Sequence, residues 1–147
     1  MQQHPTRPHP GGSGSAAVTA ALVARTDRLH FLPDHFGKFF VAAESGVFTT
    51  MRRLCPQYVG GLWDFYALSN GGALLVPTAA PHYLLRCDGN GYAGSLPAFA
   101  AGIGVCAMTY NRLAFQLHGA VFAEMFYRLH DFLAQQPEAG ELYALLD

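Results

Sequence analysis

The first third of the chain shows apolar side chains at helical spacing. Small and apolar residues from Ala16 to Arg28 suit a helix, and Pro33 is expected to end it because proline lacks a backbone donor and restrains the residue before it. The phrase RLHFLPDHFG, from Arg28 to Gly37, indicates a helix end, a turn and a new helical start. A further helix is predicted from Phe39 to Leu54, with Gly46 as a weak point that allows a division into two pieces. Its apolar face carries Phe40, Ala43, Val47, Met51 and Leu54.

The middle of the chain changes to short runs of aromatic and aliphatic residues. The turn signals SNGG and DGNG separate these runs, because asparagine and glycine readily accept positive φ. Connections this short cannot make a parallel crossover, so the runs predict an antiparallel meander of three or four strands. The predicted strands are Leu62 to Leu68, Ala73 to Pro77, His82 to Cys87 and Tyr92 to Leu96.

The last third returns to helical spacing. One helix is predicted after Pro97 and a second after a break at Gly119, with Glu124 and Arg128 four residues apart on its outer face. Pro137 stops the second helix, and a short final helix follows from Glu138 to Leu146. The inward stripes are Ile103, Ala107, Tyr110, Ala114 and Leu117, then Phe122, Phe126, Leu129 and Leu133. The pattern therefore predicts the α+β class, with about five helices covering a small antiparallel sheet.

Composition adds bounds to this picture. The chain has 147 residues, 51% of them apolar and 13% charged, so it has a core. Residues 1–15 lack large apolar side chains after the first methionine and are expected to form a disordered tail before a single domain at 16–147. A formal charge of −1 is neither the basic footprint of a nucleic-acid binder nor the acidic surface of a DNA mimic. The apolar run from Ala16 to Ala24 is too short to span a membrane.

Candidate chemistry is sparse. Cys55, Cys87 and Cys106 are an odd number at wide spacing, which indicates a reducing cytoplasm, and Cys55 is interpreted as a buried structural cysteine. His30 and His35 form the closest pair of histidines outside the tail, yet no further pair stands at ligand spacing, so no metal site is predicted. We therefore predict no catalytic residue, no metal and no cofactor.

The phrase GNGYAG, from Gly89 to Gly94, matches a phosphate-binding pattern in its letters. Phosphate cradling needs a strand, a glycine loop and a helix N-terminus in that order, whereas a strand is expected to follow here. The phrase is therefore interpreted as a hairpin turn.

An aromatic stretch around Trp63 offers a candidate surface. Alternation along a strand places Trp63 and Phe65 on one face and Asp64 and Tyr66 on the other. One interpretation is that the second face is ordinary solvated sheet. The other is that Asp64 and Tyr66, with Asn70 at the following turn, form part of a docking surface, because tyrosine combines contact area with a polar group.

Longer phrases carry a family resemblance. YVGGLWDFYALSNGG, then VP, GNGYAG and AAGI, resemble the KlcA/ArdB antirestriction proteins of plasmids and other mobile elements. RLHFLPDHFG, MRRLCP and RLHDFLAQQPEAGELYALLD are similar to the same family, so the resemblance covers roughly residues 28–147. It implies a compact mixed fold without catalytic chemistry that protects incoming DNA from type I restriction-modification systems. The low charge disfavours occupation of a DNA groove and strong nucleic-acid binding, so the hypothesis is contact with the restriction complex or a host factor. The protein is expected to be a monomer.

Two alternatives stay open at this point. A small hydrolase acting on a host factor would use Cys55, or His30 and His35, and substitution of one of them would abolish activity. A weak DNA-binding accessory protein would use Arg52, Arg53 and Lys38, and its binding would vanish as salt rises.

Overall fold

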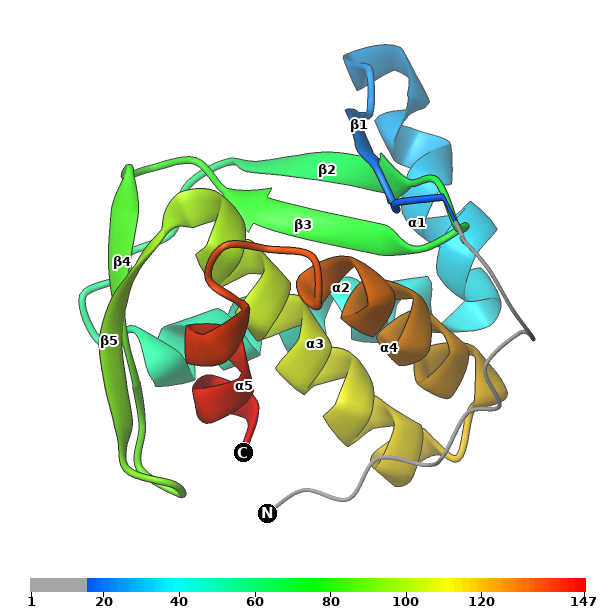
Figure 1. Ribbon diagram of the computed structural model, residues 1–147. Coiled ribbons are helices and arrows are strands. Elements are labelled where there is room, and N and C mark those ends of the chain that lie inside the picture. The colour runs from blue at the N-terminus through cyan, green and yellow to red at the C-terminus, as the bar shows by residue number, and fades with distance from the viewer. Residues whose placement is uncertain (1–15) are drawn as a thin grey trace.

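A computed structural model describes residues 16–147, and the tail predicted for residues 1–15 lies outside this part (Figure 1). Helices and two small antiparallel sheets alternate along it, so the α+β prediction is confirmed. The strands are β1 (Ala20–Leu22), β2 (Trp63–Leu68), β3 (Ala73–Pro77), β4 (His82–Cys87) and β5 (Tyr92–Pro97). The helices are η1 (Arg25–Asp27), α1 (Arg28–Phe36), η2 (Gly37–Phe39), α2 (Phe40–Leu54), α3 (Ala98–Leu117), α4 (Ala120–Leu133) and α5 (Ala139–Leu146).

The predicted single meander is split into two sheets. One sheet has the order β1-β2-β3 and the other consists of the β4–β5 hairpin, which stands across the end of β2 and β3 (Figure 1). β3 and β4 do not pair, and side chains of α3 lie along the edge of β3 instead. All strand pairs are antiparallel, with Phe65 opposite Leu75 and Leu85 opposite Gly94.

The helix predicted for Ala16 to Arg28 is wrong. Ala20–Leu22 forms β1, which pairs with the free edge of β2 so that Leu22 lies opposite Tyr66, and only the short η1 follows. Hydrogen bonds from the Ser69 amide to the Thr19 oxygen and from the Val23 amide to the Phe65 oxygen, both 2.8 Å, extend this pairing. Small apolar residues accept either conformation, so the unfilled strand edge decides between them.

Pro33 does not end a helix, because α1 continues through it from Arg28 to Phe36. Because proline has no backbone N–H, the carbonyl four residues earlier loses its helical hydrogen bond. That carbonyl belongs to the exposed Leu29, where water can act as the donor instead. The helix ends at Gly37, whose φ of +56° is readily adopted by glycine. α2 is also one continuous helix, without a division at Gly46. Gly46 allows α2 to approach α3 closely, because a Cβ there would lie 2.9 Å from the Thr109 methyl carbon.

α3 occupies the centre of the fold and covers the open edge of β3. It is buried all round from Ala100 to Tyr110, beyond the single stripe that its spacing predicts. At the edge of β3, the Tyr110 hydroxyl donates to the Ala73 oxygen at 2.8 Å. The Cys106 thiol lies 3.4 Å from both the amide nitrogen and the carbonyl oxygen of Leu75. These side chains stand in for the neighbouring strand, which satisfies the backbone groups of the edge.

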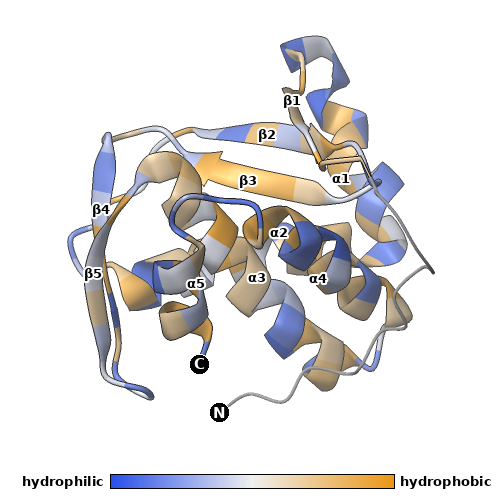
Figure 2. Ribbon diagram, viewed as in Figure 1, coloured by the Kyte–Doolittle hydropathy of each residue, from blue (hydrophilic) through white to orange (hydrophobic). Residues whose placement is uncertain are grey.

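The remaining helices match their predictions closely. α4 buries Phe122, Phe126, Leu129 and Leu133, and on its outer face Glu124 and Arg128 form an ion pair. α5 begins one residue after its predicted start and packs Leu142 and Leu145 against Gly104 of α3. Figure 2 shows β3 as a hydrophobic ribbon, with the mostly hydrophobic first turns of α3 beside it.

Candidate docking surface beside β2

β2 presents two faces with different surroundings, as its alternation predicts. Trp63 and Phe65 are buried, and the indole N–H of Trp63 donates to the Tyr58 hydroxyl at 2.7 Å. The Trp63 ring also contacts Phe48 of α2, with centroids 5.4 Å apart. Asp64 and Tyr66 are only half-buried and lie on the opposite face. The strand therefore holds Asp64 and Tyr66 at the surface by anchoring their neighbours in the core.

Arg28 completes the exposed edge of β2 next to Asp64. β1 pairs only with residues 66–68 of β2, so the carbonyl of Trp63 has no strand partner and accepts a hydrogen bond from the Arg28 guanidinium instead. The same guanidinium lies 4.6 Å from the Phe65 ring centre and 3.8 Å from the Asp64 carboxylate. The Asp64 side chain keeps 45% of its area exposed, so this ion pair is open to a partner.

Tyr66 joins Asp64 on this face. Its ring meets Phe99 edge-on, with centroids 5.3 Å apart, which fixes its orientation. Burial raises the pKa of the Tyr66 hydroxyl, and the negative charge of Asp64 raises it further. The hydroxyl is therefore a neutral donor and acceptor at physiological pH.

Asn70 lies at the other end of β2, in the turn before β3. Its Nδ2 donates to the carbonyl of Arg128 on α4 at 2.9 Å, and its Oδ1 accepts from the Gly72 amide at 3.0 Å. The structure thus brings Asp64 and Tyr66 together, while Asn70 uses both ends of its amide to hold the turn against α4. A role of Asn70 in docking stays a prediction.

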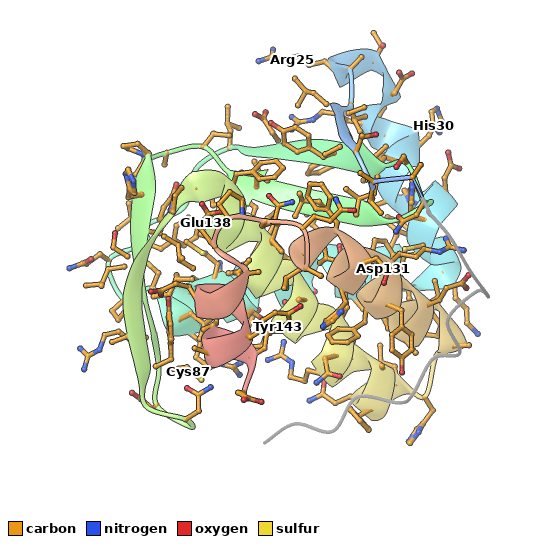
Figure 3. The ribbon with its side chains drawn as sticks, viewed as in Figure 1. Arg25, His30, Cys87, Asp131, Glu138 and Tyr143 are labelled. Carbon is orange, nitrogen blue, oxygen red and sulfur yellow. The ribbon has the colours of Figure 1, made fainter. Side chains whose placement is uncertain are left out.

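Exposed leucines that the sequence pattern does not single out lie on β1, on α1 next to Arg28, and just before β2. Leu22 lies opposite Tyr66 and is 61% exposed, while Leu29 and Leu62 are 84% and 73% exposed. We call these three leucines with Arg28, Asp64 and Tyr66 the Asp64 surface. It adjoins the corner where Figure 3 shows Arg25 and His30 directed outward. Leu22 fell within a predicted helix, so its position beside β2 had no signal in the sequence.

The residues of the enzyme and metal alternatives have ordinary structural surroundings. Cys55 is buried at the wall of a groove of about 290 Å³ between the segment after α2 and β4. Nδ1 of His35 lies 2.8 Å from the Phe31 oxygen and its ring packs on Phe31, whereas His30 is exposed. Within residues 16–147 no group of three or more His, Cys, Asp or Glu side chains is placed to hold a metal ion.

The other sequence features also have clear positions. GNGYAG forms the β4–β5 hairpin turn, with Gly91 at a φ of +75°, so the interpretation as a turn is confirmed. Arg52 and Arg53 are exposed on the last turn of α2, and Lys38 is exposed in η2 at the other end of that helix. None of the helices described in residues 16–147 has the length and apolar character that a membrane crossing requires.

Residues 56–147 match the family model described as antirestriction protein. The chain therefore belongs to the antirestriction protein family, and the predicted family is confirmed.

Among its relatives, an Escherichia coli protein named antirestriction protein KlcA is 39% identical over 135 residues, covering 88% of this chain and 95% of the relative. The uncharacterized protein YfjX of Escherichia coli K12 is 34% identical over 144 residues, covering 94% and 93%. A solved structure, from work on KlcA and ArdB, matches with a TM-score of 0.82 and 37% identity, covering 93% of this chain and all of that one. Those two proteins are described as active against type I DNA restriction systems in vivo but not in vitro.

Proposed function

We propose that this protein relieves cleavage of incoming DNA by type I restriction-modification systems, acting without catalysis through contact with the restriction complex or a host factor. The observation that carries the activity is the match to a solved structure from the KlcA and ArdB work, which covers 93% of this chain and all of that one. Activity of those proteins in vivo but not in vitro supports a requirement for a further cellular component. We further propose that residues 16–147 form one domain and that the protein acts as a monomer in the cytoplasm.

The distribution of acidic residues supports contact with protein over imitation of DNA. A duplex carries one phosphate charge per about 1.7 Å, so a mimic needs rows of unpaired carboxylates. Here the ten acidic residues are scattered over the helices, β2 and the turns, and nine basic residues nearly balance them. Two of the carboxylates, those of Asp64 and Glu124, are paired with arginines.

The Asp64 surface is the proposed contact site. Three widely exposed leucines around an accessible ion pair and a fixed tyrosine combine apolar area with polar groups, as protein interfaces do. A partner that covers Leu29 and Leu62 would also desolvate the Arg28–Asp64 pair, which strengthens its electrostatic interactions.

Plating of unmodified phage on cells that carry an active type I system tests the activity. Expression of the protein should restore plating efficiency, while methylation by the same system continues. Unchanged plating in cells that contain the soluble protein would contradict the proposed function. Stoichiometric, strongly salt-dependent displacement of DNA from the purified enzyme would contradict the mechanism.

Substitutions test the site. Asp64→Ala combined with Leu29→Asp should reduce protection at least about tenfold, because central contact residues each contribute about 1–2 kcal/mol or more. Tyr66→Phe keeps the ring against Phe99 and should give a partial loss. The matched control is Asp88→Ala with Leu84→Asp on the β4–β5 hairpin, which should retain protection. Equal loss in both double variants, at unchanged thermal unfolding, would move the contact site away from β2.

A further inference from the structure

A second polar cluster lies away from the Asp64 surface, where α2 packs against α3. Thr50 of α2 is fully buried and its hydroxyl accepts from Thr109 at 2.9 Å. Arg112 of α3 reaches across to the same hydroxyl, with its Nη2 3.3 Å away. One helical turn along α2, Nη2 of Arg53 lies 3.7 Å from the sulfur of Met108. The guanidinium groups of Arg53 and Arg112 therefore both lie at the interface between α2 and α3.

These two positive charges have no acidic partner in the part of the chain that the structure describes. The ion pairs found there join Arg28 to Asp64 and Arg128 to Glu124. Nε of Arg112 is buried and makes no hydrogen bond. Burial lowers the pKa of Arg112, and the neighbouring charge of Arg53 lowers it further. The arrangement is thus unfavourable for folding, since like charges and an unpartnered donor both cost free energy.

Arg112 turns its guanidinium toward α2 although its side chain is only partly buried. Arginine has a long flexible stem, and a half-exposed arginine such as Arg112 ordinarily extends its charge into water. Its guanidinium instead turns back over α2, toward Thr50 and Arg53. An anion placed between the two guanidinium groups would convert their repulsion into two charge-assisted interactions.

We propose that Arg53 and Arg112 form a binding site for an acidic side chain of a partner protein. The planar fork of a guanidinium matches a carboxylate, and two such forks suit a single anionic group. A nucleic-acid backbone would need a row of cations along its phosphates. Among the described residues, Arg52 also lies on α2 and the remaining basic residues lie on other elements, and the apolar Met108 adjoins the pair. This inference concerns a surface other than β2 and does not depend on the antirestriction activity.

The test follows the arginine side chains in purified protein labelled with ¹⁵N. A capped peptide with two consecutive glutamates is titrated, and the same peptide with glutamines serves as the control at equal ionic strength. The Nε–Hε signals of Arg53 and Arg112 should move with the glutamate peptide, while that of the exposed Arg25 stays still. Arg53→Ala should weaken the binding at least about tenfold, and Arg52→Ala, on the same turn of α2, should leave it unchanged.

Equal shifts with both peptides, or none beyond that of Arg25, would overturn the inference. Salt-sensitive shifts with a short DNA duplex and none with the glutamate peptide would overturn it in favour of nucleic acid. Arg112→Met gives an independent reading, because it removes the repulsion and the unpartnered nitrogen together. It should abolish peptide binding while raising the unfolding temperature, and a lowered unfolding temperature would show that Arg112 serves the fold.

Discussion

Single atoms decide how closely α3 approaches β3. A Cβ on Gly102 would lie 2.6 Å from the carbonyl oxygen of Leu75 and 3.0 Å from Cα of Val76. Both of these atoms are backbone, so the strand cannot step aside by a rotamer change. Gly102 therefore sets the distance at which the side chains of Cys106 and Tyr110 can reach the strand edge.

Gly102→Ala should destabilise the protein by about 1–3 kcal/mol, because overpacking here pushes the central helix off the sheet. Gly140→Ala is the matched control: a Cβ there meets nothing within 4 Å in α5, so it should stabilise by about 0.5–1 kcal/mol. Urea unfolding of the two variants measures both changes. Equal stability of the two variants would show that α3 and β3 adjust freely.

The residue scale also shows where sequence patterns succeed and fail at the site. Alternation in β2 predicts that Trp63 is buried while Asp64 is accessible, because strand geometry fixes the side of each neighbour. It cannot predict that Arg28, from another element, would complete the edge of the strand. Such contacts depend on which segments meet in space, and local spacing carries no information about that.

At the scale of elements, the two hairpins share one device. Each turn contains an Asn-Gly pair, and the asparagine Oδ1 accepts a hydrogen bond from the backbone amide two residues later. That amide belongs to Gly72 for Asn70 and to Tyr92 for Asn90. Each Nδ2 also donates a hydrogen bond of 2.9 Å to the carbonyl of a helix residue. Asn70 bonds to Arg128 in α4, and Asn90 bonds to Leu145 in α5. An asparagine thus forms the turn and also fastens it to a helix.

Asn70→Asp and Asn90→Asp should both destabilise the fold, since aspartate keeps the acceptor but loses the donor and faces a carbonyl with negative charge. We expect about 1–3 kcal/mol for Asn70. The cost at Asn90 should be smaller because its turn is exposed to water. Chemical denaturation of the two variants gives the comparison. A larger loss at Asn90 would contradict the ranking by burial.

Elements differ in how far local sequence defines them. α2, α4 and α5 follow from their spacing and stops, and both hairpins follow from their Asn-Gly turns. β1 does not, because Ala20–Leu22 becomes a strand only when the edge of β2 is available. The separation of β4 from β3 likewise depends on α3, which comes later in the chain.

The whole molecule should lose stability in alkali, because its core holds two weak acids in their neutral forms. Burial raises the pKa of the Cys106 thiol to about 12 and raises that of Tyr110 well above its ordinary value. In the unfolded chain these groups ionise at about pH 8.5 and 10. Above those values the unfolded state binds fewer protons than the folded state, so stability falls as pH rises.

Thermal unfolding at a series of pH values from about 8 to 11 measures this dependence. Each group should contribute up to about 1.4 kcal/mol per pH unit between its unfolded and folded pKa. Cys106→Ala should be less stable at neutral pH, because it leaves the amide and carbonyl of Leu75 without their side-chain partner. The stability of this variant should nevertheless decrease less steeply as the pH rises. An unchanged slope would assign the effect to other groups.

The covering of β3 by α3 has a consequence for synthesis on the ribosome. β2 and β3 are translated as a hairpin, but Gly102, Cys106 and Tyr110 emerge only afterwards. At a translation rate of about 5–20 residues per second, the edge of β3 stays uncovered for roughly several seconds before α3 has been synthesised. During that interval the nascent hairpin can pair with another nascent strand, and α3 ends the exposure as it docks. The order of elements along the chain therefore makes rapid helix docking the step that guards this protein against aggregation.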